Sequence, residues 1–240
     1  MEKRFVSRVD YNYMPFKKRN SLRRHICELP VVNVPDQGEQ SEQSEKLDEK
    51  GHPLRNDLCA YETPSVAELQ SFLLADRRPT GHVNQVWPDV YIGNEVAARD
   101  KPMLYNMGIT HIVNGASGPP HVNTGPRFYR DMNIDYYGVE ADDSSDFTIS
   151  VFFYGVARFI RAALSKKGRV FVHCLMGVSR SATLVLAFLM ICEELTLMEA
   201  IKATRQHRDI CPNPGFLNQL RHLDMTLVRE RKRKLEAYQS

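Results

Sequence analysis

The sequence predicts an α/β protein with a mostly parallel central sheet flanked by helices, preceded by a disordered N-terminal tail. From about residue 61 onward, short apolar segments typical of strands alternate with segments of helical periodicity. An apolar strand end at 170–172 leads into an almost wholly apolar helix at 182–192, so both are expected to be buried. Residues 36–50 (DQGEQSEQSEKLDEK) contain one aliphatic residue and cannot bury enough apolar surface to fold.

The composition is that of one globular domain with additional chain. The 240 residues are 42% hydrophobic and 25% charged, and a net charge of +3 gives no reason to expect a nucleic acid partner. No apolar run approaches the roughly 18 residues of a membrane span, and the N-terminus lacks an apolar signal core. The five cysteines are widely spread with no CxxC pair, which favours free thiols over a metal site. We therefore expect no cofactor and a cytoplasmic location that extends to the nucleus.

The chain divides into a tail at 1–60, a domain at 61–234 and a short polar tail at 235–240. The first tail is basic up to residue 25, where eight Lys and Arg face only Glu2 and Asp10, and it then becomes acidic. The basic arm either docks on a partner or is simply solvated.

The elements of the domain follow from local signals. Ser65 and Glu68 form a capping box ahead of a helix over 66–73. A helical stretch that is broken at Pro102 connects the first two strands. The strands are predicted at 86–93, 110–114, 134–139 and 169–173, and the later helices at 150–164, 182–192, 196–207 and 215–231.

The most informative segment joins the last strand to the apolar helix. Residues 175–179 must form a tight loop there, and Gly177 allows the backbone to bend and to approach a ligand closely. The helix start leaves backbone N–H groups without partners. Loop and helix N-terminus together form a natural site for a phosphate or a similar oxyanion.

Cys174 and Arg180 flank this loop and give it a chemistry. The backbone N–H groups, the helix dipole and the Arg180 charge would all stabilise a Cys174 thiolate. The planar fork of Arg180 can hold two oxygens of a phosphoryl group. A thiolate behind phosphorus with an arginine at its rim indicates phosphoryl transfer, because a lone buried cysteine would not require this spacing.

The segment HCLMGVSRS at 173–181 resembles the HCxxGxxR[ST] signature of cysteine-dependent protein phosphatases. The surrounding chain, from about 86 to 229, is similar to the atypical (VHR-like) dual-specificity phosphatases. The similar segments are VYIGN at 90–94, GITHIVNGA at 108–116, FYRDMNIDYYGVEADD at 128–143 and NPGFLNQL at 213–220.

The resemblance implies a role for each residue of the signature. Cys174 would be the nucleophile that forms a phosphocysteine, and Arg180 would bind the phosphoryl oxygens. Ser181 would assist the departing thiolate, and His173 would order the loop. Membership also implies a shallow pocket that admits phosphoserine and phosphothreonine as well as phosphotyrosine. The loop residues expected to surround the phosphoryl group are Leu175, Met176, Gly177, Val178 and Ser179.

A general acid must protonate the leaving oxygen, and two regions could supply it. Asp89 belongs to a WPD triplet, the letters of the acid loop in tyrosine-specific phosphatases, but it lies 85 residues before Cys174 and is predicted to occupy a turn. The other region is a polar loop after the strand at 134–139, where spacing leaves Asp142, Asp143 and Asp146 open. The Ala-x-Asp pattern of the resembling family selects Asp143.

The loop also bears on the substrate. Leu175, Met176 and Val178 carry no charge, whereas similar phosphatases of inositol lipids usually have lysines there, so we expect phosphoproteins and no membrane partner. Arg208 occupies a position where VHR-like enzymes hold an arginine that can contact a second phosphate. Mitogen-activated protein kinases are therefore a candidate substrate class, unless Arg208 is an ordinary surface residue.

One non-enzymatic interpretation remains: a phosphate-binding scaffold that acts mainly by docking through the basic arm. Related pseudophosphatases usually lack a signature residue. Cys174, Arg180 and Asp143 are all present here, which favours a dual-specificity protein phosphatase.

Overall fold

The computed structural model describes residues 60–77, 79–119 and 121–239, so the tail predicted at 1–60 lies outside the described residues except for its last residue. The domain is built on a five-stranded sheet with the order β1-β2-β5-β3-β4. The first pair of strands is antiparallel and the other three pairs are parallel, so the sheet is mostly parallel, as the sequence predicts. The strands are β1 (Val83–Trp87), β2 (Val90–Gly93), β3 (His111–Asn114), β4 (Asp135–Gly138) and β5 (Val170–His173).

The first strand is not the single segment at 86–93 that the sequence predicts. It is a hairpin in which β1 and β2 are joined through Pro88 and Asp89. Pro88 has no N–H for a sheet ladder, and Asp89 has a φ of 59°, in the left-handed region that aspartate tolerates better than most residues. The polar turn therefore divides an apolar run that otherwise looks continuous.

The helices begin where capping residues predict. Ser65 Oγ accepts from Glu68 N, and the Glu68 carboxylate accepts from Ser65 N, at the start of α3 (Val66–Leu74). The predicted break near Pro102 separates α4 (Glu95–Arg99) from α5 (Lys101–Asn106). The later elements are η2 (Ile149–Phe152), α6 (Phe153–Ser165), α7 (Arg180–Cys192), α8 (Leu197–Arg205) and α9 (Pro214–Gln239).

The last helix is longer than the sequence predicts. α9 continues to Gln239 instead of ending near 231, so most of the segment expected to be a polar tail at 235–240 is helical. None of the helices in the described part of the chain is both long and apolar enough to cross a membrane.

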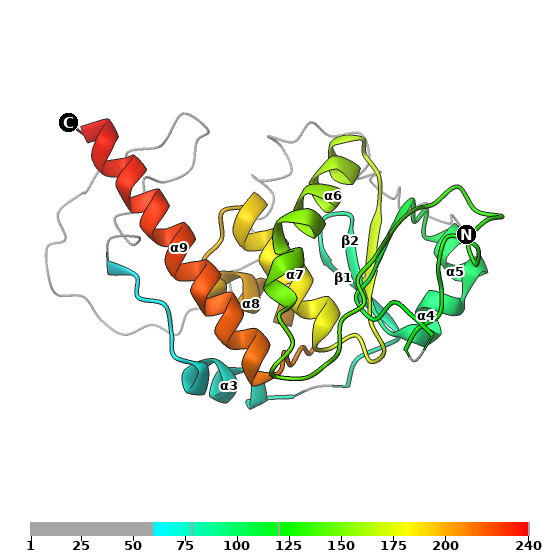
Figure 1. The fold of residues 1–240 in the computed structure, drawn as a ribbon, viewed down its shortest axis with the longest axis horizontal. Helices are drawn as coiled ribbons and strands as arrows, with labels where there is room; N and C mark the ends of the chain where they lie inside the picture. Colours follow the sequence, from blue (N-terminus) through cyan, green and yellow to red (C-terminus); the bar gives the residue numbers. More distant parts are fainter. Residues whose placement is uncertain (1–59, 78, 120, 240) are drawn as a thin grey trace, which may run out of the picture. The chain divides into compact units, whose positions relative to one another are not determined.

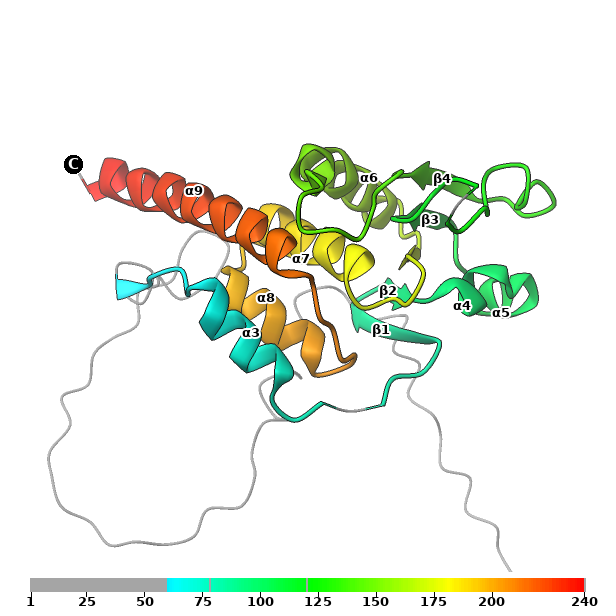
Figure 2. The same cartoon turned by 60° about the horizontal axis from the view of Figure 1, so that its bottom comes forward.

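The sheet has helices on both faces, as predicted. Figure 1 shows β1 and β2 between α7 on one side and α4 and α5 on the other. Figure 2 shows α3 and α6–α9 on one side and α4 and α5 on the other. Side chains of β5 alternate between the two layers: Val170 and Val172 join the core formed with α6–α9, whereas Phe171 joins the smaller core formed with α4 and α5. The α7 residues from Arg180 to Met190 are all buried. A buried strand and a buried helix thus hold the loop between them rigidly.

Candidate active site

The loop between β5 and α7 has its backbone carbonyls turned outward. Five carbonyls between His173 and Val178 accept hydrogen bonds from outside the loop, two of them from Arg208. The donors are Gly115 N to His173 O (2.7 Å), Glu95 N to Leu175 O (3.0 Å), Arg208 Nη2 to Met176 O (3.3 Å), Arg208 Nε to Gly177 O (2.7 Å) and Cys211 N to Val178 O (2.8 Å). In a trans peptide unit the C=O and N–H point in opposite directions. The loop therefore turns its N–H groups inward, which is the arrangement that binds an oxyanion.

Gly177 is required by this geometry. Its φ is +71°, and a Cβ at this position would lie 2.5 Å from Gly93 O. Only glycine combines the left-handed backbone with so close an approach to β2. The predicted role of Gly177 as the bending point of the loop is confirmed.

The Cys174 thiol lies at the centre of the loop. Its side chain is 1% exposed, and Sγ accepts from Gly177 N at 3.2 Å. Ser181 Oγ lies 3.3 Å from the same sulfur. A backbone N–H and a hydroxyl group thus converge on the sulfur.

Arg180 begins α7 and is 5% exposed at its side chain. Its Nη1 donates to Ala141 O at 2.9 Å, which ties α7 to the predicted acid loop. Its Nε lies 3.5 Å from Asp143 Oδ2 but makes no proper hydrogen bond with any residue that the structure describes. A buried guanidinium N–H without a partner is suited to an anionic ligand.

The acid loop contacts the phosphate-binding loop through Asp143. Asp143 Oδ1 accepts from Ser179 Oγ at 2.6 Å and from Asn213 Nδ2 at 2.9 Å. Asp142 instead pairs with His121 Nε2 at 3.0 Å, and Asp146 is exposed. Of the three candidate aspartates, Asp143 is the one whose carboxylate meets the loop.

The route of the acid loop differs from the one expected. β4 is separated from β5 by β3, so the two loops do not follow neighbouring strands. Backbone bonds from Val139 N to Asn114 O (2.8 Å) and from Ser117 N to Val139 O (2.9 Å) carry the chain across the end of β3. The carboxyl edge of the sheet nevertheless gathers both loops, as the general rule for parallel sheets predicts.

Asn213 is a site residue that the sequence analysis did not single out. Its Oδ1 accepts from Phe216 N at 2.9 Å near the start of α9, and its backbone N donates to Ser179 Oγ at 3.2 Å. The same side chain donates to Asp143. The available signal was an asparagine one residue before Pro214, a typical helix start, within a segment already noted for its resemblance.

His173 is fully buried at the end of β5. It stacks on Phe171 with ring centroids 5.3 Å apart, and its Nδ1 lies 3.4 Å from Cys174 O. Burial lowers the pKa of His173 to about 3, so the imidazole is neutral at physiological pH. His173 is thus a neutral, buried residue at the base of the loop.

Arg208 does not lie where the second-phosphate prediction requires. Its side chain is 2% exposed, and it is neither an ordinary surface arginine nor a residue at the mouth of the site. Nε donates to Gly177 O (2.7 Å), Nη2 to Met176 O (3.3 Å), and Nη1 to Gly81 O (2.9 Å) and Asn84 Oδ1 (2.7 Å). Burial lowers the pKa of Arg208. The guanidinium lies beneath the loop.

Asp89 lies at the opposite end of the sheet. Its backbone O accepts from Val170 N at 2.8 Å, where β5 begins, whereas Cys174 follows the last residue of that strand. Four residues of strand separate the two by about 13 Å. The prediction that Asp89 occupies a turn is confirmed by its φ of 59°.

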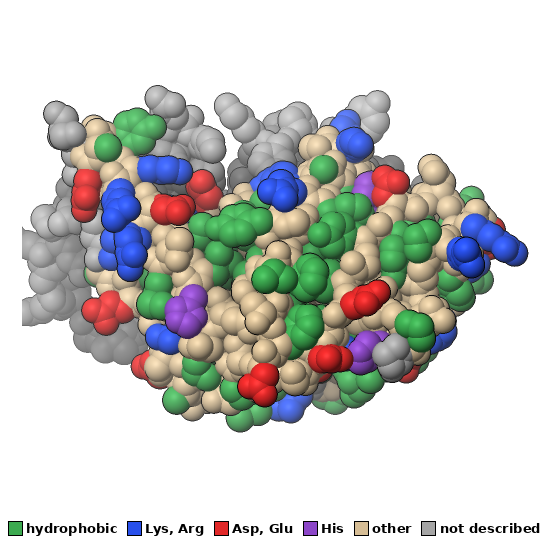
Figure 3. All heavy atoms as spheres, in the orientation of Figure 1, with side chains coloured by type: hydrophobic (Ala, Val, Ile, Leu, Met, Phe, Trp, Pro, Cys, Tyr) green, Lys and Arg blue, Asp and Glu red, His purple; other side chains and the backbone are tan. Residues whose placement is uncertain are grey.

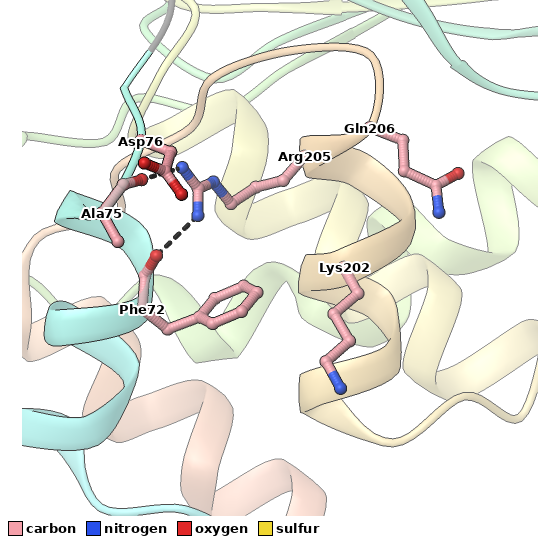
Figure 4. A pocket seen from close by; sticks show the side chains of 6 residues that line it. All are labelled: Phe72, Ala75, Asp76, Lys202, Arg205 and Gln206. Carbon is pink, nitrogen blue, oxygen red and sulfur yellow. Dashed lines mark hydrogen bonds between the residues drawn. The ribbon is translucent and has the colours of Figure 1, made fainter. Parts of the chain in front are cut away.

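A groove lies between α3 and α8, away from the Cys174 loop. This groove of about 620 Å³ is lined by Phe72, Ala75, Asp76, Lys202, Arg205 and Gln206 (Figure 4). Arg205 closes the end of α3 by donating to Phe72 O and Ala75 O, both at 2.5 Å. In Figure 3 hydrophobic side chains also gather on the face over α6 and α7.

No cluster of His, Cys, Asp and Glu among the described residues could hold a metal ion.

The family follows from comparison with known proteins. Residues 90–225, more than half of the chain, match the family model described as dual specificity phosphatase, catalytic domain. The chain belongs to the dual specificity phosphatases. Human dual specificity protein phosphatase 13B is 57% identical over 172 residues, which cover 71% of this chain and 87% of the relative. The mouse protein of that name is 54% identical over 175 residues, covering 72% and 88%.

Solved structures of this phosphatase family share the fold. Human DUSP28 is 26% identical with a TM-score of 0.55, covering 64% of this chain and 99% of that one. A mouse putative dual specificity phosphatase in complex with zinc tungstate is 28% identical with a TM-score of 0.57, covering 66% and 96%. The predicted fold, the atypical family and the enzyme class are thus confirmed: this is a dual-specificity protein phosphatase.

Proposed function

We propose that this phosphatase hydrolyses phosphotyrosine, phosphoserine and phosphothreonine in proteins through a phosphocysteine intermediate formed on Cys174. The observation that carries the proposal is the position of Cys174 Sγ, which accepts from Gly177 N at 3.2 Å at the centre of a loop whose carbonyls are turned outward. Such a loop binds three phosphoryl oxygens by its N–H groups while the sulfur faces phosphorus.

In the first step the Cys174 thiolate attacks phosphorus. An S–P bond forms as the P–O bond to the substrate side chain breaks, and the leaving oxygen takes a proton from the Asp143 carboxyl group. Arg180 stabilises the charge on the equatorial oxygens with its fork. The contact of Asp143 with Ser179 Oγ supports this assignment, because it holds the acid at the rim of the loop.

In the second step a water molecule attacks the phosphocysteine. The water gives its proton to the Asp143 carboxylate, and the S–P bond breaks with its electron pair returning to sulfur. Ser181 Oγ, 3.3 Å from Sγ, donates a hydrogen bond to the departing thiolate. Inorganic phosphate and the original enzyme result, so no cofactor is consumed.

Trapping the intermediate tests this mechanism. Ser181→Ala should slow the second step more than the first, so rapid quenching after mixing with an aryl phosphate should accumulate a phosphoryl group on Cys174, detectable by mass spectrometry. The expected kinetics are a burst of phenol followed by slow phosphate release. If Ser181→Ala released phenol and phosphate together with no adduct on Cys174, the covalent mechanism would be wrong.

Phosphoproteins are the substrates that family membership implies, and mitogen-activated kinases are the specific class that we propose. The sequence argument for this class used Arg208, which is buried, so the remaining support is the resemblance to the VHR-like enzymes. Cys174→Ser or Asp143→Ala used as a substrate trap should enrich doubly phosphorylated kinase activation loops from cell extract. Enrichment of other phosphoproteins without these kinases would reject the class while leaving the mechanism intact.

A further inference from the structure

We propose that Arg208 is a positioning residue that sets the shape of the phosphate-binding loop from beneath. Every hydrogen bond that its guanidinium makes within the described part of the chain goes to an oxygen atom of the protein. Two of these oxygens belong to the loop, Gly177 O (2.7 Å) and Met176 O (3.3 Å). Arg208 as a whole residue is 2% exposed, so its side chain is not open to substrate in this arrangement.

The far side of the guanidinium is fixed independently of the loop. Nη1 donates to Gly81 O at 2.9 Å and to Asn84 Oδ1 at 2.7 Å. Asn84 belongs to β1, and Gly81 lies just before that strand. Because the guanidinium is planar, fixing Nη1 also fixes the directions in which Nε and Nη2 point. Arg208 thus links the edge hairpin of the sheet to the loop.

The two loop contacts determine where two amide groups point. Met176 O shares a peptide unit with Gly177 N, and Gly177 O shares one with Val178 N. Because C=O and N–H are opposed in a trans peptide, holding the carbonyls toward Arg208 turns these N–H groups toward the site. Gly177 N does point there, since it donates to Cys174 Sγ at 3.2 Å.

Arg208 also contributes charge. It is a buried cation, and it binds the carbonyl of Gly177, the residue whose N–H donates to Cys174 Sγ. Two effects are therefore expected from one residue. The fork orients the N–H groups that bind the oxyanion, and the positive charge favours an anion in the loop. Substitutions can separate them, because lysine keeps the charge and loses the planar fork.

Arg205 provides a matched control within the same region. Its side chain is mostly buried, donates to Phe72 O and Ala75 O at the end of α3, and lies 3.6 Å from Asp209 Oδ1. None of these partners belongs to the loop. Arg205→Met should lower thermal stability, as Arg208→Met should. It should not change the loop.

The experiment measures tungstate affinity by calorimetry and the rate of Cys174 alkylation by iodoacetamide at neutral pH, in the full chain. Arg208→Met should weaken tungstate binding about 10- to 100-fold, by analogy with the loss seen when an outer partner of a metal ligand is removed. It should also slow alkylation. Arg208→Lys should recover much of the alkylation rate while tungstate binding stays weak. Arg205→Met should match the wild type in both measurements.

Several results would overturn the proposal. One is unchanged tungstate binding in Arg208→Met, and another is an equal loss in Arg205→Met, which would indicate general destabilisation. If Arg208→Met does not fold, Asn84→Ala serves instead, because it removes one anchor of the fork without touching the loop. Asn84→Ala should weaken tungstate binding by a smaller factor, and wild-type binding would reject the role. The proposal rests on the proposed function only in that the loop binds a phosphoryl group. Binding is measured without turnover, so the role of Arg208 can fail while the Cys174 chemistry holds.

Discussion

The two ends of β5 carry the same pair of side chains and differ in almost everything else. At the amino end, Arg169 Nε lies 3.5 Å from Asp89 Oδ1, and at the carboxyl end, Arg180 Nε lies 3.5 Å from Asp143 Oδ2. The side chains of the first pair are 37% and 41% exposed. In the second pair Arg180 is 5% exposed and Asp143 34%.

The surroundings decide what each pair can do. Arg169 also donates to Met107 O at 2.7 Å, and an exposed ion pair of this kind contributes about 0–1 kcal/mol, so the amino end is structural. At the carboxyl end, α7 begins and the N–H groups of the loop point into the site. Arg180 is buried there, and its Nε has no hydrogen-bond partner among the described residues. An arginine and an aspartate can take part in phosphoryl transfer only where the backbone also supplies an oxyanion site.

The largest effect on turnover is expected for Cys174, directly after the carboxyl end of β5, and none for Cys192 at the far end of α7. Cys174→Ser should abolish turnover of aryl phosphates, since removing the nucleophile of a hydrolase can cost about 10⁶-fold. Tungstate binding should be largely retained, because the loop N–H groups and Arg180 remain. The measurement is steady-state hydrolysis with calorimetry in parallel. Cys192→Ser, at the opposite end of α7, is the control and should keep normal turnover. A tenth or more of wild-type activity in Cys174→Ser would refute the covalent mechanism.

The second prediction compares the two aspartates directly. Asp143→Asn should slow hydrolysis of peptide phosphotyrosine by about 10²–10⁴-fold, and less for nitrophenyl phosphate, whose leaving group needs no proton. Asp89→Asn should leave both rates unchanged, because asparagine also tolerates the left-handed backbone at that turn. A series of leaving groups at several pH values measures this. Leaving-group dependence in Asp89→Asn and not in Asp143→Asn would reverse the assignment.

The contrast between the two ends shows what the sequence could reveal. The strand, the apolar helix and the loop between them were predictable because burial and helix-start chemistry are local properties of the chain. The WPD letters at Trp87-Pro88-Asp89 were rejected from spacing, and the structure agrees, because Asp89 lies in the β1–β2 turn beside the start of β5. Residues alone left Asp142, Asp143 and Asp146 equivalent, and the contact with Ser179 separates them.

Arg208 and Asn213 could not be placed from the sequence for a different reason. Their partners lie 31 and 70 residues away along the chain, at Gly177 and Asp143. Contacts at such separations depend on how helices pack on the sheet, which no local pattern encodes. The hairpin at β1 and β2 was missed for a local reason, because a two-residue turn interrupted an apolar run.

A third prediction concerns how Asp143 is held. Asn213→Ser keeps a side-chain oxygen that can cap α9 but loses the Nδ2 donor to Asp143. We expect about a 10- to 100-fold slower turnover with poor leaving groups, little change with nitrophenyl phosphate and an almost unchanged melting temperature. A merely structural role would slow both substrates equally or lower stability instead. Either pattern would exclude Asn213 as a positioning residue for the acid.

The smallest effect compares a histidine at each end of the sheet. Burial lowers the pKa of His173 to about 3, against about 6.5 in the unfolded chain. Between pH 3 and pH 6.5 the unfolded chain binds a proton at His173 that the folded protein does not. The contribution of neutral His173 to the free energy of unfolding is therefore complete above about pH 6.5 and is lost as the pH falls toward 3. His173 should account for about 1 kcal/mol of the stability lost between pH 7 and pH 5.5. Denaturant titrations of His173→Gln should therefore show a smaller loss of unfolding free energy between pH 7 and pH 5.5, even though the variant is less stable at pH 7.

His111, at the start of β3, is the control. It is less buried, and Asp135 at 3.2 Å opposes the lowering of its pKa, so His111→Gln should change the pH dependence of stability less. Equal slopes in wild type and His173→Gln would mean that His173 is not held neutral by the fold.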